Sequence, residues 1–229
     1  MEILSRDTLP LGGFAGITEH RLVTDSRIFG ARKKAETFEG LGNMVYLADA
    51  RYLPQGSSGM HPHSEIDVIS IIIEGRVSHE GSLEHGKDLA AGEVQVQRAG
   101  GEGFSHNEIN PDKQQNRMLQ VWALPEKAGQ PAGYKTYKPS LNGTTRIYGG
   151  GSDRGATFDS GTLMDIAHVK AGEQLKLDKA HLIYIISGTA QAVSGHVTKQ
   201  IQEGDLIRGD NLALTSTEAL HLLIVSQNN

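Results

Sequence analysis

Short apolar segments, separated at short intervals by Gly, Pro, Asn and Asp, run through nearly the whole chain of 229 residues. No stretch keeps a 3.6-residue amphipathic period over three turns, and the region where a helix is most expected is Ile28–Gly40. Segments of this kind are typical of an antiparallel β-sandwich or β-barrel, so we expect an all-β fold. The predicted strands are Met44–Leu53, Ile66–Ile73, Gly92–Gln97, Met118–Leu124, Leu163–Val169, His181–Ile186, Ala190–Val193 and Ala219–Val225.

The strand pattern occurs twice. Ile71-Ile72-Ile73-Glu74-Gly75 is followed, 17 residues after its glycine, by Gly92-Glu93-Val94. Tyr184-Ile185-Ile186-Ser187-Gly188 is followed, 16 residues after its glycine, by Gly204-Asp205-Leu206. Two copies of one meander predict two similar β-domains, which we place at residues 1–134 and 135–229. The stretch Pro125–Gly151 is rich in Pro, Gly, Lys and Ser and is predicted to be the linker.

Composition excludes several functions. The net charge is −5 and no segment concentrates Lys and Arg, so we expect neither a nucleic acid nor a membrane as partner. No basic region followed by an apolar one opens the chain, and its apolar runs are too short to span a bilayer, so the expected location is the cytoplasm. The chain has no Cys, so a metal site would need His, Asp and Glu ligands.

Two short clusters carry such ligands. His61-Pro62-His63 and His106-Asn107-Glu108 each hold two metal-capable side chains at positions i and i+2, which point to the same face of a strand. Two neighbouring strands would bring all four together, and three imidazoles with one carboxylate suit Fe(II) or a similar divalent ion. The alternative interpretation is that the two clusters bind no metal. In a chain with 10 His a His-x-His arises by accident, and the Gly-rich stretch before His106 is then only a flexible turn. The residues alone leave both interpretations open.

The run from His61 to Pro125 resembles the pirin family of two-domain cupins. The features that match are His61-Pro62-His63, Ile72-Ile73-Glu74-Gly75, Ser78-His79-Glu80-Gly81-Ser82-Leu83, Gly92-Glu93-Val94-Gln95, Ala99-Gly100, Gly103, His106-x-Glu108 and Leu119-Gln120-Val121-Trp122-Ala123-Leu124-Pro125. The resemblance implies two tandem cupin barrels, each a double-stranded β-helix of the jelly-roll type. The C-terminal half has His181 but no paired His or Glu cluster, so its barrel is expected to be degenerate and metal-free.

The resemblance also implies a metal ion held by His61, His63, His106 and Glu108, with Asp67 in a supporting or structural role. Iron as Fe(II) is the expected ion, although Ni, Mn, Cu and Zn accept the same ligands. Ser64-Glu65 departs from many relatives and changes the charge at the mouth of the pocket, which leaves the substrate open.

Three functions follow from such a site. The first is a dioxygenase that opens flavonols such as quercetin with O2 and releases carbon monoxide, with Glu108 as the group that accepts the 3-hydroxyl proton. The second is a non-catalytic, iron-dependent redox-sensing or regulatory module that binds another protein. The third, a sugar- or phosphate-handling cupin, ranks last because no Arg/Lys cluster lies beside the ligands. The expected partners are a small aromatic or flavonoid substrate and O2, and the chain is expected to be a monomer.

Overall fold

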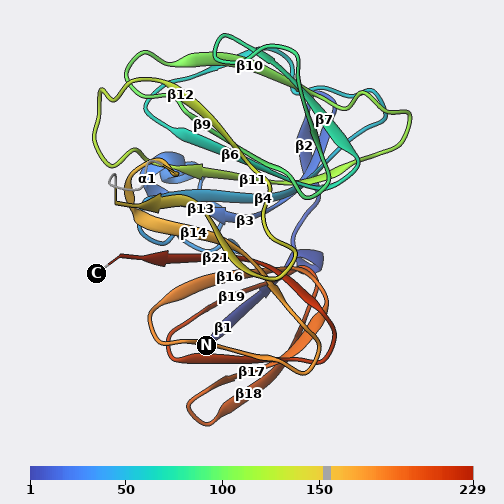
Figure 1. Cartoon of the computed structure of the whole chain (residues 1–229), viewed down its shortest axis with the longest axis vertical. Coiled ribbons are helices and arrows are strands. Elements are labelled where there is room, and N and C mark those ends of the chain that lie inside the picture. Colours follow the sequence, from blue (N-terminus) through green and yellow to red (C-terminus); the bar gives the residue numbers. More distant parts are fainter. Residues whose placement is uncertain (152–155, 229) are drawn as a thin grey trace. The chain divides into compact units, whose positions relative to one another are not determined.

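The structure is a computed structural model that describes residues 1–151 and 156–228. The chain divides into two compact units, Leu9–Lys138 and Met1–Thr8 together with Pro139–Asn229. Each unit is built from two antiparallel sheets that enclose an interior (Figure 1). The predictions of an all-β fold and of two similar barrels are confirmed. The helices of the described residues are all too short and too polar to cross a membrane.

The first unit contains a seven-stranded sheet in the order β12-β9-β6-β11-β4-β3-β2 and a four-stranded sheet in the order β5-β10-β7-β8. Its strands are β2 (Gly12–Phe14), β3 (Ile17–Thr24), β4 (Met44–Tyr52), β5 (His61–His63), β6 (Asp67–Glu74), β7 (Arg76–Gly81), β8 (Lys87–Ala90), β9 (Val94–Arg98), β10 (Phe104–Ile109), β11 (Arg117–Ala123) and β12 (Gly133–Tyr137).

The second unit contains a six-stranded sheet in the order β1-β19-β16-β21-β14-β13 and a four-stranded sheet in the order β15-β20-β17-β18. Its elements are β1 (Glu2–Ser5), the 3-10 turn η1 (Arg6–Thr8), β13 (Gly143–Gly150), β14 (Ser160–Val169), β15 (Gln174–Leu177), β16 (His181–Ser187), β17 (Thr189–Ser194), β18 (Val197–Gln202), β19 (Asp205–Gly209), β20 (Leu212–Ser216) and β21 (Leu220–Gln227).

Apart from β2, each strand of the first unit has a counterpart at the same place in the sheets of the second unit. The sequence repeat therefore corresponds to a repeated pair of sheets. The hairpins β6–β7 and β16–β17 turn at Gly75 and Gly188, whose φ angles are +73° and +90°. Strands β9 and β19 each begin just after a second glycine with positive φ, Gly92 and Gly204. Glycine adopts such angles without the steric penalty of a Cβ atom, so the four glycines fix the same turns in both barrels.

Two predictions of local structure are wrong. The expected linker Pro125–Gly151 contains all of β12 and all of β13. The expected helix Ile28–Gly40 is reduced to one turn, α1 (Ser26–Phe29), and the 3-10 turn η2 (Gly30–Arg32). The Asp25 side chain caps α1 at Arg27 N, but Gly30 with φ +50° ends the helix after one turn.

The first eight residues, which the sequence places with the N-terminal barrel, cluster with the second unit. Strand β1 forms an antiparallel pair with β19, from Glu2 opposite Arg208 to Ser5 opposite Asp205. It occupies the sheet edge that β12 occupies beside β9 in the first unit. Each barrel therefore closes this edge with a strand from outside the repeated meander.

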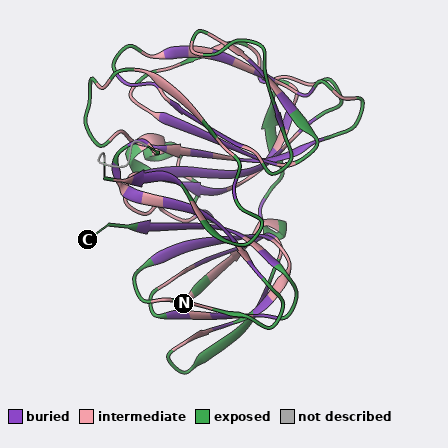
Figure 2. Ribbon diagram, viewed as in Figure 1, coloured by how far each residue is buried: buried purple, intermediate pink, exposed green. Residues whose placement is uncertain are grey.

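The interiors of the two barrels differ in chemistry. The core of the second unit is apolar and includes Ile183, Ile207, Leu212 and Leu214. In Figure 2 buried residues follow the strands of both units, whereas most of β18 is exposed. The first unit buries polar side chains on β6, β7, β9 and β10. The equivalent positions of the second unit carry apolar residues, except that Gly209 takes the place of Gln97. These buried polar residues are Ser70, His79, Gln95, Gln97, His106 and Glu108.

The repeated glycine turn gives a matched pair of substitutions. A Cβ atom at Gly188 would lie 2.2 Å from the Ala219 carbonyl oxygen, whereas one at Gly172, with φ +82°, would meet nothing within 4 Å. We expect Gly172→Ala to lower the free energy of unfolding by about 1–2 kcal/mol, from backbone strain alone. Gly188→Ala should lower the free energy of unfolding by clearly more, because the Ala219 backbone carbonyl must also move. Urea unfolding of both variants measures this, and equal losses would contradict the packing described for the turn.

Candidate metal centre

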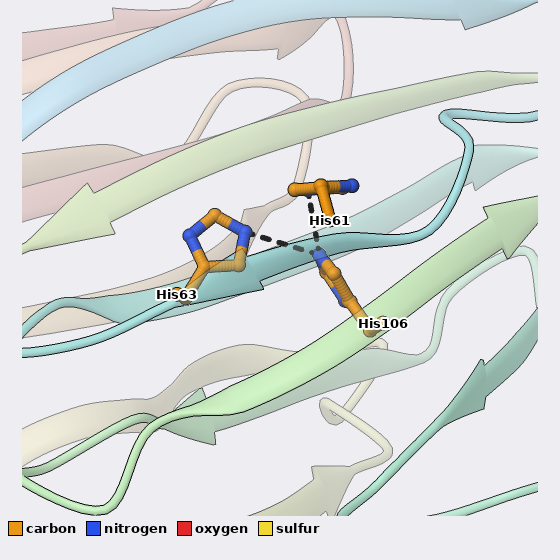
Figure 3. Close-up of side chains that lie close together, drawn as sticks. All are labelled: His61, His63 and His106. Carbon is orange, nitrogen blue, oxygen red and sulfur yellow. Dashed lines mark hydrogen bonds between the residues drawn. The ribbon is translucent and has the colours of Figure 1, made fainter.

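The pairing of β5 with β10 brings three predicted ligands together. His61 lies opposite His106 and His63 lies opposite Phe104 in the antiparallel register. The Nε2 atom of His106 lies 3.1 Å from Nε2 of His61 and 3.2 Å from Nε2 of His63 (Figure 3). The ligand nitrogens of the three residues all lie within 4.8 Å of one another. Pro62, between the two histidines of β5, is exposed and marks the rim of the barrel.

This geometry suits a single cation. Two nitrogens that bind one ion at about 2.1 Å and about 90° apart lie about 3.0 Å from each other. The separations of 3.1 and 3.2 Å between the Nε2 atoms agree with that value. The three imidazoles come from two neighbouring strands, and their nitrogens point to one spot. The cluster therefore fits a divalent transition metal by both its donor type and its spacing.

The surroundings of His63 and His106 keep these two imidazoles neutral, as metal ligands must be. Burial, together with the neighbouring His106 and His61, lowers the pKa of His63 to about 3. Burial, together with His61 and His79, lowers the pKa of His106 to about 3. Both residues therefore present unprotonated nitrogens at neutral pH.

Glu108 faces the same interior two residues after His106, but it is not part of the compact nitrogen cluster. Its Oε1 atom accepts hydrogen bonds from Ser70 Oγ at 2.6 Å and from Gln95 Nε2 at 2.5 Å, and its Oε2 atom accepts one from Tyr52 at 3.0 Å. A carboxylate offers about four lone-pair sites, so one site on Oε2 stays available. The role of Glu108 as the fourth ligand stays a prediction.

The histidines and Glu108 line one cavity inside the first barrel. Its apolar wall comprises Phe14, Ile17, Ala50, Val68, Met118 and Trp122. Across the cavity Glu19, which is 3% exposed, accepts hydrogen bonds from Tyr46 Oη and from Arg21, both at 2.7 Å. Burial, and then the charge of Glu19, raises the pKa of Tyr46 well above its usual value. The Tyr46 ring stacks on Trp122 at 4.4 Å between centroids, which gives this wall a flat aromatic surface.

Several residues of the site were not predicted from sequence. Tyr52, Gln97 and Glu19 lie on β4, β9 and β3, and spacing along the chain does not connect them to the ligands. His79 is 1% exposed on β7, with Nε2 2.9 Å from Gln97 Oε1. Asp67 is buried on β6 but does not line the cavity. Glu65 accepts a hydrogen bond from Gly129 N, which ties it to the loop before β12.

Comparison with known proteins agrees with this architecture. Residues 26–123 match the family model described as Pirin. A provisionally named quercetin 2,3-dioxygenase of Zymomonas mobilis is 38% identical over 81 residues, which is 35% of this chain and only 34% of that protein. Another, from Pseudomonas aeruginosa, is 29% identical over 178 residues, covering 72% of this chain and 75% of that protein.

The same architecture occurs in a solved structure. The bacterial pirin YhhW from Escherichia coli, described in complex with nickel(II), superimposes with a TM-score of 0.83 over 98% of this chain and 97% of that one, at 17% identity. The fold is therefore that of the bicupins. The match of residues 26–123 to the Pirin model confirms the resemblance to the pirin family.

The lowered pKa of His106 predicts a dependence of stability on pH. Between about pH 6.5 and pH 3 the unfolded chain binds a proton at this residue and the folded chain does not, so the free energy of unfolding must fall as the pH falls. The slope from one such residue approaches about 1.4 kcal/mol per pH unit. Urea unfolding of the metal-free protein from about pH 7 to pH 5 should therefore show a steeper loss than in His106→Leu. Equal slopes would mean that His106 is protonated in the folded state.

Proposed function

We propose that the chain is a metal-dependent dioxygenase that opens flavonols such as quercetin with O2. The observation that carries the proposal is the convergence of three imidazoles beside a buried carboxylate inside an aromatic-walled cavity. The provisional names of the Zymomonas and Pseudomonas relatives support the reaction. The nickel(II) complex of the Escherichia coli pirin supports a transition metal. Fe(II) is the ion we propose, held by His61, His63 and His106, with Glu108 as fourth ligand.

A divalent ion held by these residues would supply Lewis acidity, which favours the ionised form of a bound flavonol. The protein's own groups do the rest. Glu108 accepts the proton of the 3-hydroxyl group on Oε2, the oxygen that accepts only one hydrogen bond. Ser70 and Gln95 hold Oε1 and so fix the orientation of the carboxylate. Loss of this proton produces the electron-rich enolate that reacts with O2.

Other residues of the cavity wall provide contacts for the substrate. The stacked rings of Tyr46 and Trp122, with Met118 and Val68, offer apolar surface to a planar aromatic substrate. Glu19 lies across the cavity as a hydrogen-bond acceptor for a ring hydroxyl. Phe14 stands on the short strand β2 and is 48% exposed, so it forms part of the rim. Together these residues favour a polyphenol over a phosphorylated or purely aliphatic ligand.

Replacing two ligands tests the metal centre directly. His61→Ala and His106→Ala should each abolish stoichiometric binding of Fe(II) or Ni(II), because each removes one nitrogen of the cluster. His181→Ala, in the second unit, is the matched control and should bind metal as the wild type does. Elemental analysis and chelator competition measure binding. Unchanged metal content in the first two variants would overturn the assignment of these ligands.

Turnover separates an enzyme from a binding module. The iron-loaded protein should consume O2 and release carbon monoxide with quercetin, and should leave quercetin unchanged under anaerobic conditions. Glu108→Gln keeps the size of the side chain but removes the base, so we expect a loss of about 100-fold or more in kcat. A protein that binds metal and consumes no O2 with a panel of flavonols and catechols would instead be the non-catalytic sensing or regulatory module.

A further inference from the structure

A flavonol needs more room than the cavity at the histidines offers. That cavity has a volume of about 40 Å3, whereas sites that enclose a small organic ligand have about 300–1,000 Å3. A second cavity, of about 310 Å3, lies in the same unit. Glu19 lines both cavities, so the two are neighbours. The second cavity is lined by residues 9–13, Glu19, Arg21, Lys34, Glu36 and Thr37.

A short strap, residues 10–15, also lies between the two cavities. Gly12 and Gly13 line the second cavity, and the next residue, Phe14, lines the first. The strap contains β2, which is the edge strand of its sheet, and all three residues of β2 are exposed. A segment with so few buried contacts opens at a low cost in free energy. Movement of the strap away from β3 would join the two cavities.

The residues on both sides of the strap are fixed. Leu9 is 5% exposed, and its carbonyl oxygen lies 3.1 Å from Nδ1 of His20. Gly16 N donates to the Ser57 carbonyl oxygen at 3.0 Å. Strand β3 is held on its other side by its pairing with β4. Movement is therefore confined to residues 10–15, while the rest of the wall stays in place.

The charges of the second cavity define the class of ligand that it suits. Its lining includes two carboxylates, Glu19 and Glu36, and two cations, Arg21 and Lys34. The charges balance, so no excess positive charge favours a phosphate or a carboxylate. Glu19 is 3% exposed, and its Oε1 atom accepts from Arg21, whereas its Oε2 atom accepts from Tyr46 at 2.7 Å. Oε2 has a lone pair left for a ligand hydroxyl, so the cavity suits a neutral hydroxylated ring.

We propose that the second cavity is the distal part of the substrate site and binds the hydroxylated pendant ring of a flavonol, with Glu19 as the specificity-determining residue. The pendant ring is attached to the carbon next to the 3-hydroxyl group, so it extends away from the histidines and past the displaced strap. Gly12 and Gly13 have no side chains to block its path. One ring hydroxyl donates to Oε2 of Glu19. The inference rests on the proposed function, which places the 3-hydroxyl group at the ligands.

Isothermal titration under anaerobic conditions, where no turnover occurs, tests the selectivity. The two ligands are quercetin and galangin, a flavonol that lacks both hydroxyls of the pendant ring and is otherwise identical. We expect the wild-type protein to bind quercetin at least about 10-fold more tightly, because a hydrogen bond to a buried carboxylate is strong. Burial of apolar surface alone would favour galangin. Equal or reversed affinities would overturn the proposal.

Glu19→Gln and Glu36→Gln form a matched pair on the wall of the second cavity. Gln presents one oxygen where Glu presents two, and in Glu19→Gln that oxygen is occupied by Arg21. We expect Glu19→Gln to weaken quercetin binding by about 10-fold and to leave galangin binding unchanged. Glu36 is exposed, so water replaces its contacts, and Glu36→Gln should change neither affinity. Equal effects of the two variants on quercetin would contradict the role of Glu19.

Gly12→Leu tests the cavity while it leaves the Glu19 side chain in place. A Cβ atom at Gly12 would lie 3.7 Å from the Glu19 carbonyl oxygen, an ordinary contact, so the variant should fold. The added side chain takes up room in the second cavity, and both flavonols should bind about 10-fold more weakly. Unchanged binding would exclude the second cavity from the substrate site. A selective wild-type protein that consumes no O2 would instead overturn the proposed dioxygenase and leave the distal site in place.

Discussion

The first barrel depends on hydrogen-bond partners for the polar side chains that strand β10 buries in its interior. Strand β10 points His106 and Glu108 into the interior, each only 1% exposed, and an unpaired polar atom in such a place costs about 1–3 kcal/mol. The partners come from the opposite sheet. Gln95 and Gln97 of β9 alternate with Val94 and Val96, so both glutamines face inward and each reaches one residue of β10. The site geometry follows from this cross-barrel pairing.

The second barrel has the same architecture but carries apolar side chains where the first barrel buries these polar ones. Glu108 lies opposite His79, and at the equivalent place Leu214 lies opposite Ala192. In the same way Leu212 takes the place of His106 and Ile207 that of Gln95. All of these replacements lie in one apolar cluster, and each buried apolar side chain contributes about 1.5–3 kcal/mol. The repeat therefore preserves the backbone and its glycine turns, while one copy holds ligand atoms and the other a hydrophobic core.

The sequence predicts which side chains share one face of a strand. It does not predict which side chains meet across the interior of the barrel. Spacing of two residues places His61 with His63 and His106 with Glu108, because side chains alternate along a strand. No spacing relates His106 to Gln97 or Glu108 to Tyr52, since the loops between their strands vary in length. Strands β12 and β13 escaped prediction because they carry few buried residues and follow Pro and Gly. The β1–β19 pair joins residues about 200 positions apart, for which local patterns give no signal.

The packing around the ligands also bears on how the site and the fold depend on each other. In structural zinc sites the free energy of metal binding is the free energy of folding, and the metal-free chain is unfolded. The first unit here has an apolar cluster that contains none of the four candidate ligands and comprises Ile17, Ala50, Tyr52, Ile72, Val77, Leu89 and Met118. A buried Leu, Ile or Met side chain contributes about 1.5–3 kcal/mol. The first barrel therefore has a source of stability apart from its ligands, which a structural zinc site lacks.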